Sequence, residues 1–276
     1  MDIRQQVEKD TPRVIPARKD YLIDKIPSEP ESAVCAKHGE YTFKYTDCYG
    51  GKAIRSSSCM ECESERNHFI DSEVVRIEGE RKKEKLENEI LNSGVSRRNL
   101  HKTFDTYIAS TPEQAKAKAI YKCFADSVCN DAIAKSLIVC GSVGTGKTHL
   151  ASSVINQVVN NKKRCELIKI IDLIRGFKST WSKDNESTEE DFLNYYTKIP
   201  ALIIDEVGVQ FGSDTEKMVI FDIIDGRYNN MLPTALISNL ALPDVKELIG
   251  ERAVDRMRED GGVVVAMSWE SHRGVK

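Results

Sequence analysis

The chain has 276 residues, of which 40% are hydrophobic and 30% are charged, and its formal net charge is −3. This length accommodates one domain of ordinary size and a smaller module, and the hydrophobic fraction supports a buried core. The slightly acidic balance excludes a global basic field, so contact with nucleic acid requires a local basic face. No apolar run approaches a membrane span, and the polar first ten residues do not resemble a secretory signal, so we expect a cytoplasmic protein.

Composition divides the chain into four segments. We interpret residues 1–30, which are polar and proline-containing, as a flexible tail. Residues 31–66 hold a cluster of cysteines and one histidine. The mixed charges and thin apolar stripe in residues 67–99 predict a connector helix that ends near Gly94. The remaining residues, 100–276, form the largest domain.

The spacing of the cysteine cluster predicts a structural zinc site. Cys35-x₂-His38 is followed by twenty residues and then by Cys59-x₂-Cys62. Two ligand pairs of this spacing suit tetrahedral zinc, and a module this small needs the metal to fold. Two alternatives stay open: Cys48 replaces His38 as the fourth ligand, or the cysteines bind no metal. A catalytic zinc is disfavoured because protein groups already fill four positions.

A phosphate-binding loop begins the nucleotide site. Its sequence is Gly141-Ser142-Val143-Gly144-Thr145-Gly146-Lys147-Thr148, which fits G-x-x-x-x-G-K-[ST]. An apolar strand pattern precedes it and a helical pattern begins with His149, which we include in the site. In this context the backbone N–H groups of the loop surround phosphates. Lys147 is expected to reach the β- and γ-phosphates, and the Thr148 hydroxyl is expected to hold Mg²⁺.

A second motif supports the first. The apolar run at 201–204 ends in Asp205 and Glu206, as a buried parallel strand with acids at its carboxyl end does. Ligands of open α/β sheets collect at that end. Asp205 is then expected to bind Mg²⁺ and Glu206 to polarise the attacking water. The alternative is a strand that ends in a solvated acidic turn.

The apolar periodicity predicts an α/β fold with a parallel sheet and helices on both faces. Strands are expected near 137–140, 166–169, 201–205, 234–238 and 262–267, and helices at 147–161, 171–182, 215–230 and 243–258. If the fourth strand lies next to the first, Asn239 lies beside the γ-phosphate and can orient water. The alternative is an ordinary turn asparagine.

Three arginines lie close together near the C-terminus. They are Arg252, Arg256 and Arg258, and the first two share one helical face. An arginine supplied by a neighbouring subunit can reach a γ-phosphate and stabilise its charge. The alternative is an ordinary charged helix.

The order of these motifs resembles the DnaC-type replicative helicase loaders, which are AAA+ ATPases. Besides the two nucleotide motifs, the resemblance rests on K-T-F-D-T-Y at 102–107, I-S-N-L at 237–240, G-E-R-x-x-D-R-M-R at 250–258 and W-E-S-H-R at 269–273. It covers about residues 100–276. The Cys/His module is similar to that of zinc-containing relatives in phages and prophages.

The resemblance implies roles for single residues. Asn239 matches the sensor 1 position, and Arg256 matches the arginine finger that acts in the adjacent subunit. Arg273 matches the sensor 2 arginine, although His272 stands where a tyrosine is common. The family lacks the separate helical lid of larger AAA+ proteins. Its members bind a hexameric helicase and single-stranded DNA, and they use ATP as a switch.

In this family an extra helix faces the DNA. It lies between the second strand and the strand that ends in the two acids, the Walker B strand, which here ends in Asp205 and Glu206. Here that interval holds residues 172–181. Arg175 and Lys178 are expected to meet phosphates, and Phe177 or Trp181 to stack on bases. Alternatively, the two aromatic residues, which are four positions apart, form the buried face of a helix. Acidic residues follow closely, so any basic face is narrow.

These observations favour an ATP-hydrolysing loader that delivers a hexameric helicase onto single-stranded DNA and associates with copies of itself. A rival is an IstB-like transposition ATPase, which shares the same core and acts on duplex DNA beside a transposase. A third interpretation is a nucleotide-gated zinc adaptor with little ATPase activity. A small-molecule kinase is disfavoured because the sequence shows no second substrate site.

Overall fold

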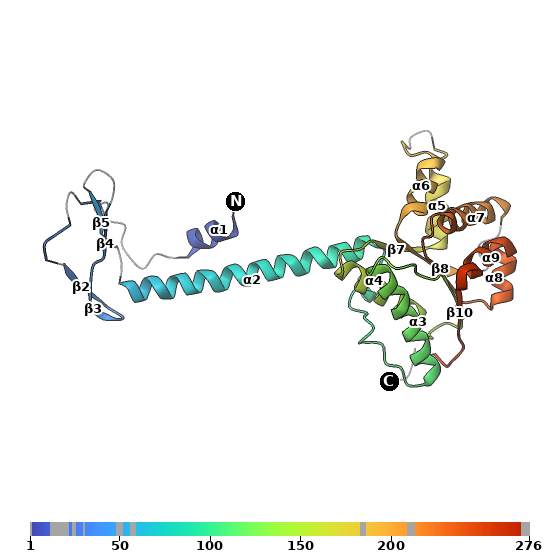
Figure 1. Ribbon diagram of the computed structural model, residues 1–276, viewed down its shortest axis with the longest axis horizontal. Coiled ribbons are helices and arrows are strands. Elements are labelled where there is room, and N and C mark those ends of the chain that lie inside the picture. The colour runs from blue at the N-terminus through green and yellow to red at the C-terminus, as the bar shows by residue number, and fades with distance from the viewer. Residues whose placement is uncertain are drawn as a thin grey trace. The chain divides into compact units, whose positions relative to one another are not determined.

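The computed structural model describes residues 2–11, 22–23, 26–29, 31–47, 52–55, 59–182, 186–208 and 213–271. The chain divides into two compact units, Met1–Glu84 and Lys85–Lys276, and the boundary falls within the long helix α2 (Met60–Asn92). Among the described residues, no helix is both long enough and apolar enough to cross a bilayer. Figure 1 shows the elements of both units.

The first unit has little hydrophobic core. Besides α2 it contains α1 (Ile3–Asp10), β1 (Leu22–Ile23), β2 (Ser32–Cys35), β3 (Gly39–Thr42), β4 (Tyr45–Asp47) and β5 (Ala53–Arg55). Strands β2 and β3 form one antiparallel hairpin, and β1, β5 and β4 form a second small sheet. The buried hydrophobic residues described here are Val7, Ala53, Cys59, Cys62 and Ile70. So small a core needs additional stabilisation to fold.

The start of the chain differs from the predicted flexible tail, because residues 3–10 form helix α1. The Asp2 side chain caps this helix by accepting a hydrogen bond from the Arg4 backbone N–H. Arg4 lies 3.2 Å from the Asp71 carboxylate on α2, and Arg66 donates to the Glu8 carbonyl at 3.1 Å. Helix α1 therefore packs on α2 within the first unit. Residues 12–21 of the predicted tail lie outside the described residues.

A helix lies where the sequence predicts the connector, and it is longer than predicted. It begins at Met60, so Cys62 lies in its first turn, and it ends at Asn92. Gly94 follows with φ 90°, and a Cβ there would lie 1.8 Å from the Leu167 carbonyl oxygen. Only glycine fits both the backbone angle and this close approach. The Leu167 N–H donates to the Ser93 carbonyl at 2.8 Å, a contact that lies entirely within the second unit.

The second unit is built around a parallel five-stranded sheet. Its elements are η1 (Arg97–Asn99), α3 (Pro112–Cys129), β6 (Leu137–Gly141), α4 (Lys147–Asn160), β7 (Cys165–Lys169), α5 (Ile170–Ser179), α6 (Glu189–Lys198), β8 (Ala201–Val207), α7 (Asp214–Asn229), β9 (Thr234–Ser238), α8 (Leu242–Ile249), α9 (Glu251–Arg258), η2 (Glu259–Gly261) and β10 (Val263–Met267). The strand order is β10-β6-β9-β8-β7, and every neighbouring pair is parallel. The predicted α/β class, the parallel sheet and its five strands are therefore confirmed.

Helices cover both faces of this sheet (Figure 1). Alternate residues of β6 face opposite sides, as the two-residue period of a strand requires. Leu137 and Val139 belong to the core under α3 and α4, whereas Ile138 and Cys140 belong to the core under α5 and α7–α9. The central strands are buried on both faces, which explains their continuous apolar sequences.

Three helical predictions need correction. Helices α3 and α6 were not predicted, although each begins with a capping box, formed by Thr111 with Gln114 and by Thr188 with Asp191. The helix expected at 243–258 is two helices, α8 and α9, because Gly250 between them has φ 91°. Apolar periodicity runs through this break, so only the backbone angle separates the two helices.

Candidate nucleotide site and candidate metal centre

The P-loop lies between β6 and α4, as the sequence predicts. Strand β6 ends at Gly141, the loop follows, and Lys147 is the first residue of α4. Gly144 and Gly146 have φ angles of 88° and 97°, which L-residues rarely adopt. The two glycines therefore let the loop turn back at the positively polarised amino-terminal end of α4.

The Lys147 side chain is held inside this loop. It is only 6% exposed. Its ammonium donates to the carbonyl oxygens of Gly141 and Ser142, both at 2.7 Å, and lies 3.5 Å from the Thr145 hydroxyl. A phosphate that enters the loop competes with these carbonyls for the ammonium. The lysine is thus placed at the loop before any ligand arrives.

The two predicted magnesium ligands lie together although 57 positions separate them. The Thr148 hydroxyl donates to Asp205 Oδ2 at 3.2 Å. Asp205 is 6% exposed, and burial raises its pKa, while the Glu206 backbone N–H donates to Oδ1 at 2.7 Å. Magnesium takes oxygen ligands, often one or two from protein together with phosphate oxygens. The donor set fits this ion.

A bulge in β8 gives the side chains of Asp205 and Glu206 different surroundings. Ile204 pairs with Leu236 but Val207 pairs with Ser238, so β8 has one residue more than β9 over this stretch. Glu206 lies in the bulge with φ 60°, a strained angle for this residue. Asp205 therefore stays buried beside the P-loop, whereas the Glu206 side chain is 52% exposed.

Sequence reasoning missed the partner of Glu206. Lys169, the last residue of β7, places its ammonium 3.0 Å from the Glu206 carboxylate, and this contact raises the pKa of Lys169. The register pairs Lys169 with Asp205, so the lysine lies at the carboxyl end of the sheet beside both acids. The strand order, which periodicity alone does not provide, was needed to find it.

Two other predicted nucleotide residues have different surroundings. Strand β9 lies between β6 and β8, so the fourth strand of the domain does lie next to the first, as the predicted role of Asn239 requires. Asn239 is exposed and follows β9 directly.

The His149 ring lies 3.1 Å from the Thr103 carbonyl and 3.2 Å from the Thr106 hydroxyl. It also packs edge-on against Tyr107. This ring therefore fixes the segment before α3, and burial lowers its pKa.

The arginines of α9 lie against α7. Arg256 pairs with Asp225 at 2.8 Å and with Glu259 at 3.2 Å, and its guanidinium lies 4.6 Å from the centre of the Tyr228 ring. Its side chain remains 39% exposed. Arg252 lies over the Phe221 ring at 5.7 Å. The two residues share a face, as predicted, and the role of Arg256 in a neighbouring subunit stays a prediction. Arg273 lies outside the described residues.

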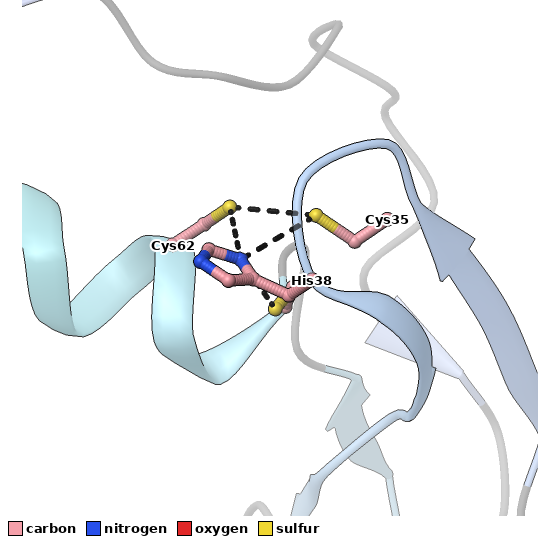
Figure 2. A group of neighbouring side chains, drawn as sticks. Cys35, His38 and Cys62 are labelled. Atoms are coloured by element: carbon pink, nitrogen blue, oxygen red, sulfur yellow. Dashed lines mark hydrogen bonds between the residues drawn. The ribbon is translucent and has the colours of Figure 1, made fainter.

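In the first unit, the predicted zinc ligands converge. Figure 2 shows Cys35, at the end of β2, His38 in the following turn and Cys62 on α2 directed toward one another. His38 Nδ1 lies 3.7 Å from the Cys35 sulfur, 3.5 Å from the Cys59 sulfur and 3.3 Å from the Cys62 sulfur. The sulfurs of Cys35 and Cys62 are 3.5 Å apart, and all four ligand atoms lie within 4.8 Å of one another.

These separations suit a tetrahedral ion. Zinc bound about 2.3 Å from sulfur and about 2.0–2.1 Å from nitrogen holds its ligand atoms about 3.5–3.8 Å apart. The backbone N–H groups of Lys37 and His38 lower the pKa of Cys35 to about 6, which favours the thiolate that a metal requires. The other His38 nitrogen lies 3.3 Å from the Glu65 carboxylate, which orients the ring. Cys48, the alternative ligand, lies outside the described residues.

Comparison with known proteins identifies an ATP-binding family, in agreement with the P-loop seen in the structure. The family model described as IstB-like ATP binding protein matches residues 54–264, more than half of the chain. The chain belongs to this family. The Replicative helicase loader DnaC of Buchnera aphidicola subsp. Acyrthosiphon pisum is 33% identical over 209 residues, which cover 76% of this chain and 83% of the relative. The DnaC of Escherichia coli K12 is 30% identical over 197 residues, 71% and 79% of the two chains.

Solved structures also relate this IstB-like family member to DnaC. The crystal structure of the DnaC helicase loader has a TM-score of 0.53 and 25% identity, and the match covers 62% of this chain and 99% of that one. The replication initiator DnaA bound to AMPPCP and single-stranded DNA has a TM-score of 0.52 at 23% identity over 61% and 50% of the two chains, which indicates fold alone. The predicted AAA+ P-loop fold is therefore confirmed.

Within this IstB-like ATP-binding domain, one predicted DNA contact is wrong. Phe177 is only 3% exposed and packs against Trp181 and Phe192 in the core under α5, so its ring cannot stack on a base. Trp181 is 55% exposed, and its indole N–H donates to Glu189 at 2.6 Å. The alternative, that the aromatic pair is the buried face of a helix, is correct for Phe177.

The two cations of α5 are accessible. The Arg175 side chain is 73% exposed and lies 3.6 Å from Asp172. Lys178 is 44% exposed and lies 3.0 Å from Glu216 on α7. Each already has an acidic neighbour, so the basic face on this helix is narrow, as the sequence indicated.

Proposed function

We propose that this chain is an ATP-dependent loader that delivers a hexameric replicative helicase onto single-stranded DNA, with ATP binding and hydrolysis as its switch. The observation that carries the proposal is the contact between Thr148 and Asp205, which joins the P-loop and the acidic strand in one site. The relatives named replicative helicase loader DnaC support the delivery role.

The proposed hydrolysis assigns each side chain a separate task. Lys147 leaves the loop carbonyls and binds the β- and γ-phosphates, and the loop N–H groups bind the same oxygens. Thr148 and Asp205 would hold Mg²⁺, which neutralises charge on the phosphates when bound. Glu206 polarises the attacking water, and Asn239 orients it from the neighbouring strand.

The ion pair with Lys169 gives Glu206 two possible arrangements. While its carboxylate is paired with the Lys169 ammonium, a carboxylate oxygen is engaged by that contact and not by water. Glu206 acts on water only after it turns from Lys169 toward the phosphate site. This rearrangement offers a point at which a partner can control when ATP is hydrolysed.

Self-association is part of the proposal because one catalytic group comes from an adjacent copy. Arg256 is partly exposed on α9 and can exchange its contact with Asp225 for a γ-phosphate held by a neighbouring subunit. Arg273, by its place in the sequence, is proposed as the sensor 2 arginine. Hydrolysis then depends on assembly, as a timing device requires.

Replacing Arg256 by alanine is expected to slow hydrolysis by the assembly about 10- to 100-fold while ATP remains bound, because one charged contact to the transferred phosphate is lost. Steady-state turnover and nucleotide affinity are measured at protein concentrations below and above those at which the chain assembles. Arg252→Ala, one helical turn earlier, is the matched control. Equal turnover of the Arg256 variant and its parent in the assembly contradicts the finger role.

For single-stranded DNA we propose phosphate contacts by Arg175 and Lys178, with Trp181 at the end of the same helix offering an exposed ring. Phosphate contacts of this kind weaken with rising salt. For the first unit we propose structural zinc held by Cys35, His38, Cys59 and Cys62, because their ligand atoms all lie within 4.8 Å of one another.

The matching family is described as IstB-like ATP binding protein, which keeps in view the second candidate function, a transposition ATPase that acts on duplex DNA. Co-purification separates the two. We expect the chain to retain the replicative helicase of its own host in the presence of ATP and to lose it with ADP. Retention of a transposase and not of the helicase contradicts the loader. Retention of either partner without measurable hydrolysis favours the zinc adaptor.

A further inference from the structure

The segment after β10 lies along the P-loop. Strand β10 is parallel to β6, and Met267 pairs with Gly141, so the chain leaves the sheet beside the start of the loop. Two residues later the Trp269 indole N–H donates to the Thr145 carbonyl at 2.9 Å. A Cβ on Gly144 would lie 1.9 Å from the Ser271 hydroxyl oxygen, so the segment also contacts the loop at that glycine.

We propose that Trp269 is a positioning residue of the nucleotide site, which orients the peptide between Thr145 and Gly146 for phosphate binding. In a trans peptide the C=O and the N–H point in opposite directions. The indole fixes this carbonyl toward Trp269, so the Gly146 N–H of the same peptide points the opposite way, and in this proposal it is the group that meets the phosphates. This inference rests on nucleotide binding at the P-loop, a part of the proposed function that does not depend on the helicase.

The surroundings of both groups make this hydrogen bond specific. The Trp269 ring packs against the core formed by α3, α4 and the sheet, so its N–H has a fixed direction. Thr145 is fully buried, and its hydroxyl donates to the Ser142 carbonyl at 3.0 Å, so the acceptor is fixed as well. Indole is a donor and never an acceptor, which suits a carbonyl partner. Phenylalanine retains the ring but cannot make this bond.

The same contact makes Trp269 a sensor of loop occupancy. When phosphate draws Lys147 away from the carbonyls of Gly141 and Ser142, the loop between them and Thr145 must adjust. Trp269 and Ser271 touch that loop directly, so the adjustment changes the environment of the indole. A bound nucleotide is thereby communicated to the chain that follows β10.

The first test is Trp269→Phe in the full chain. We expect its Kd for ATP and for ADP to rise about 2- to 10-fold through the loss of one hydrogen bond, while the unfolding temperature falls by only a few degrees, about 2–4 °C per kcal/mol lost. Tyr195→Phe is the matched control, because it also removes one aromatic donor, to Glu166 at 2.8 Å, far from the loop, and should leave the Kd unchanged. A Trp269→Phe variant that binds both nucleotides as tightly as its parent overturns the proposal.

The second test uses fluorescence. The sequence has two tryptophans, so a Trp181→Phe background leaves Trp269 as the single indole. We expect saturating ATP to shift its emission, and the shift to follow binding measured independently by calorimetry. Binding without any change in emission overturns the sensing role. No nucleotide binding by the parent overturns the P-loop assignment and this proposal together, whereas failure to retain a helicase affects only the loader function.

Discussion

Replacing Lys147 by alanine is expected to raise the Kd for ATP about 10²–10⁴-fold. In the proposed complex the ammonium makes two charge-assisted hydrogen bonds to phosphate oxygens, and each contributes about 1.5–3 kcal/mol. In the structure the same ammonium is held by two loop carbonyls at 2.7 Å, so the lysine is already placed at the site. Calorimetric titration with ATP and Mg²⁺ measures the effect.

The control for this variant is Lys122→Ala. Lys122 is an exposed lysine on α3, outside the nucleotide motifs, and its loss should leave the Kd unchanged. Thermal unfolding of both variants establishes that the sheet and α4 remain folded. Unchanged ATP affinity in a folded Lys147 variant removes the P-loop from the site.

Removal of zinc is expected to unfold the first unit and to spare the second. Structural zinc contributes about 10–16 kcal/mol of apparent binding free energy in small zinc-dependent folds, more than the total stability of most small domains. The described hydrophobic core of this unit is small and includes two of the proposed ligands, Cys59 and Cys62. Apart from the proposed metal, the described links from the hairpin of β2 and β3 to α2 include exposed polar contacts such as that of Lys37 with Glu65. The sheet of the second unit has its own buried core on both faces.

Metal content and thermal unfolding check this expectation. We expect one zinc ion per chain, and we expect a strong chelator to abolish one unfolding transition while nucleotide binding persists. Cys62→Ser should lose the metal, whereas Cys123→Ser, which changes an exposed cysteine on α3, should keep it. Less than one ion per chain in the parent protein, or loss of ATP binding on chelation, contradicts the assignment.

Much of the nucleotide site could be predicted from sequence because the residues that define its motifs lie close together along the chain. The P-loop requires glycines at fixed offsets from Lys147, and the apolar run before Asp205 identifies a doubly buried strand. The spacing of Cys35 and His38, and of Cys59 and Cys62, predicts ligand pairs by the same local logic. Each of these signals depends on residues that are close neighbours along the chain.

Helix boundaries were predicted less completely, for a physical reason. Helix α3 buries Tyr121 and Phe124 against the sheet, but its apolar residues are mixed with lysines and alanines. The break between α8 and α9 depends on the backbone angle of Gly250. Apolar periodicity reports which face is buried and is insensitive to a single turn of the backbone.

Contacts between distant segments were decided by the tertiary structure alone. The strand order places Lys169 beside Glu206 and Trp269 beside Thr145, and neither pair is visible in the sequence. The buried Arg227 is a similar case: it donates to carbonyls before β8 and before β9, and thereby joins α6 to the sheet.

The class of fold, the P-loop and the clustering of the four Cys and His side chains of the proposed zinc site can be read from the sequence, since each follows from local spacing and periodicity. The burial of Phe177, the exposure of Arg175 and the ion pair between Glu206 and a lysine follow from the packed fold and from no local pattern. The reason is that burial and pairing depend on which strand lies beside which. That order results from packing over the whole sheet, so no short segment encodes it.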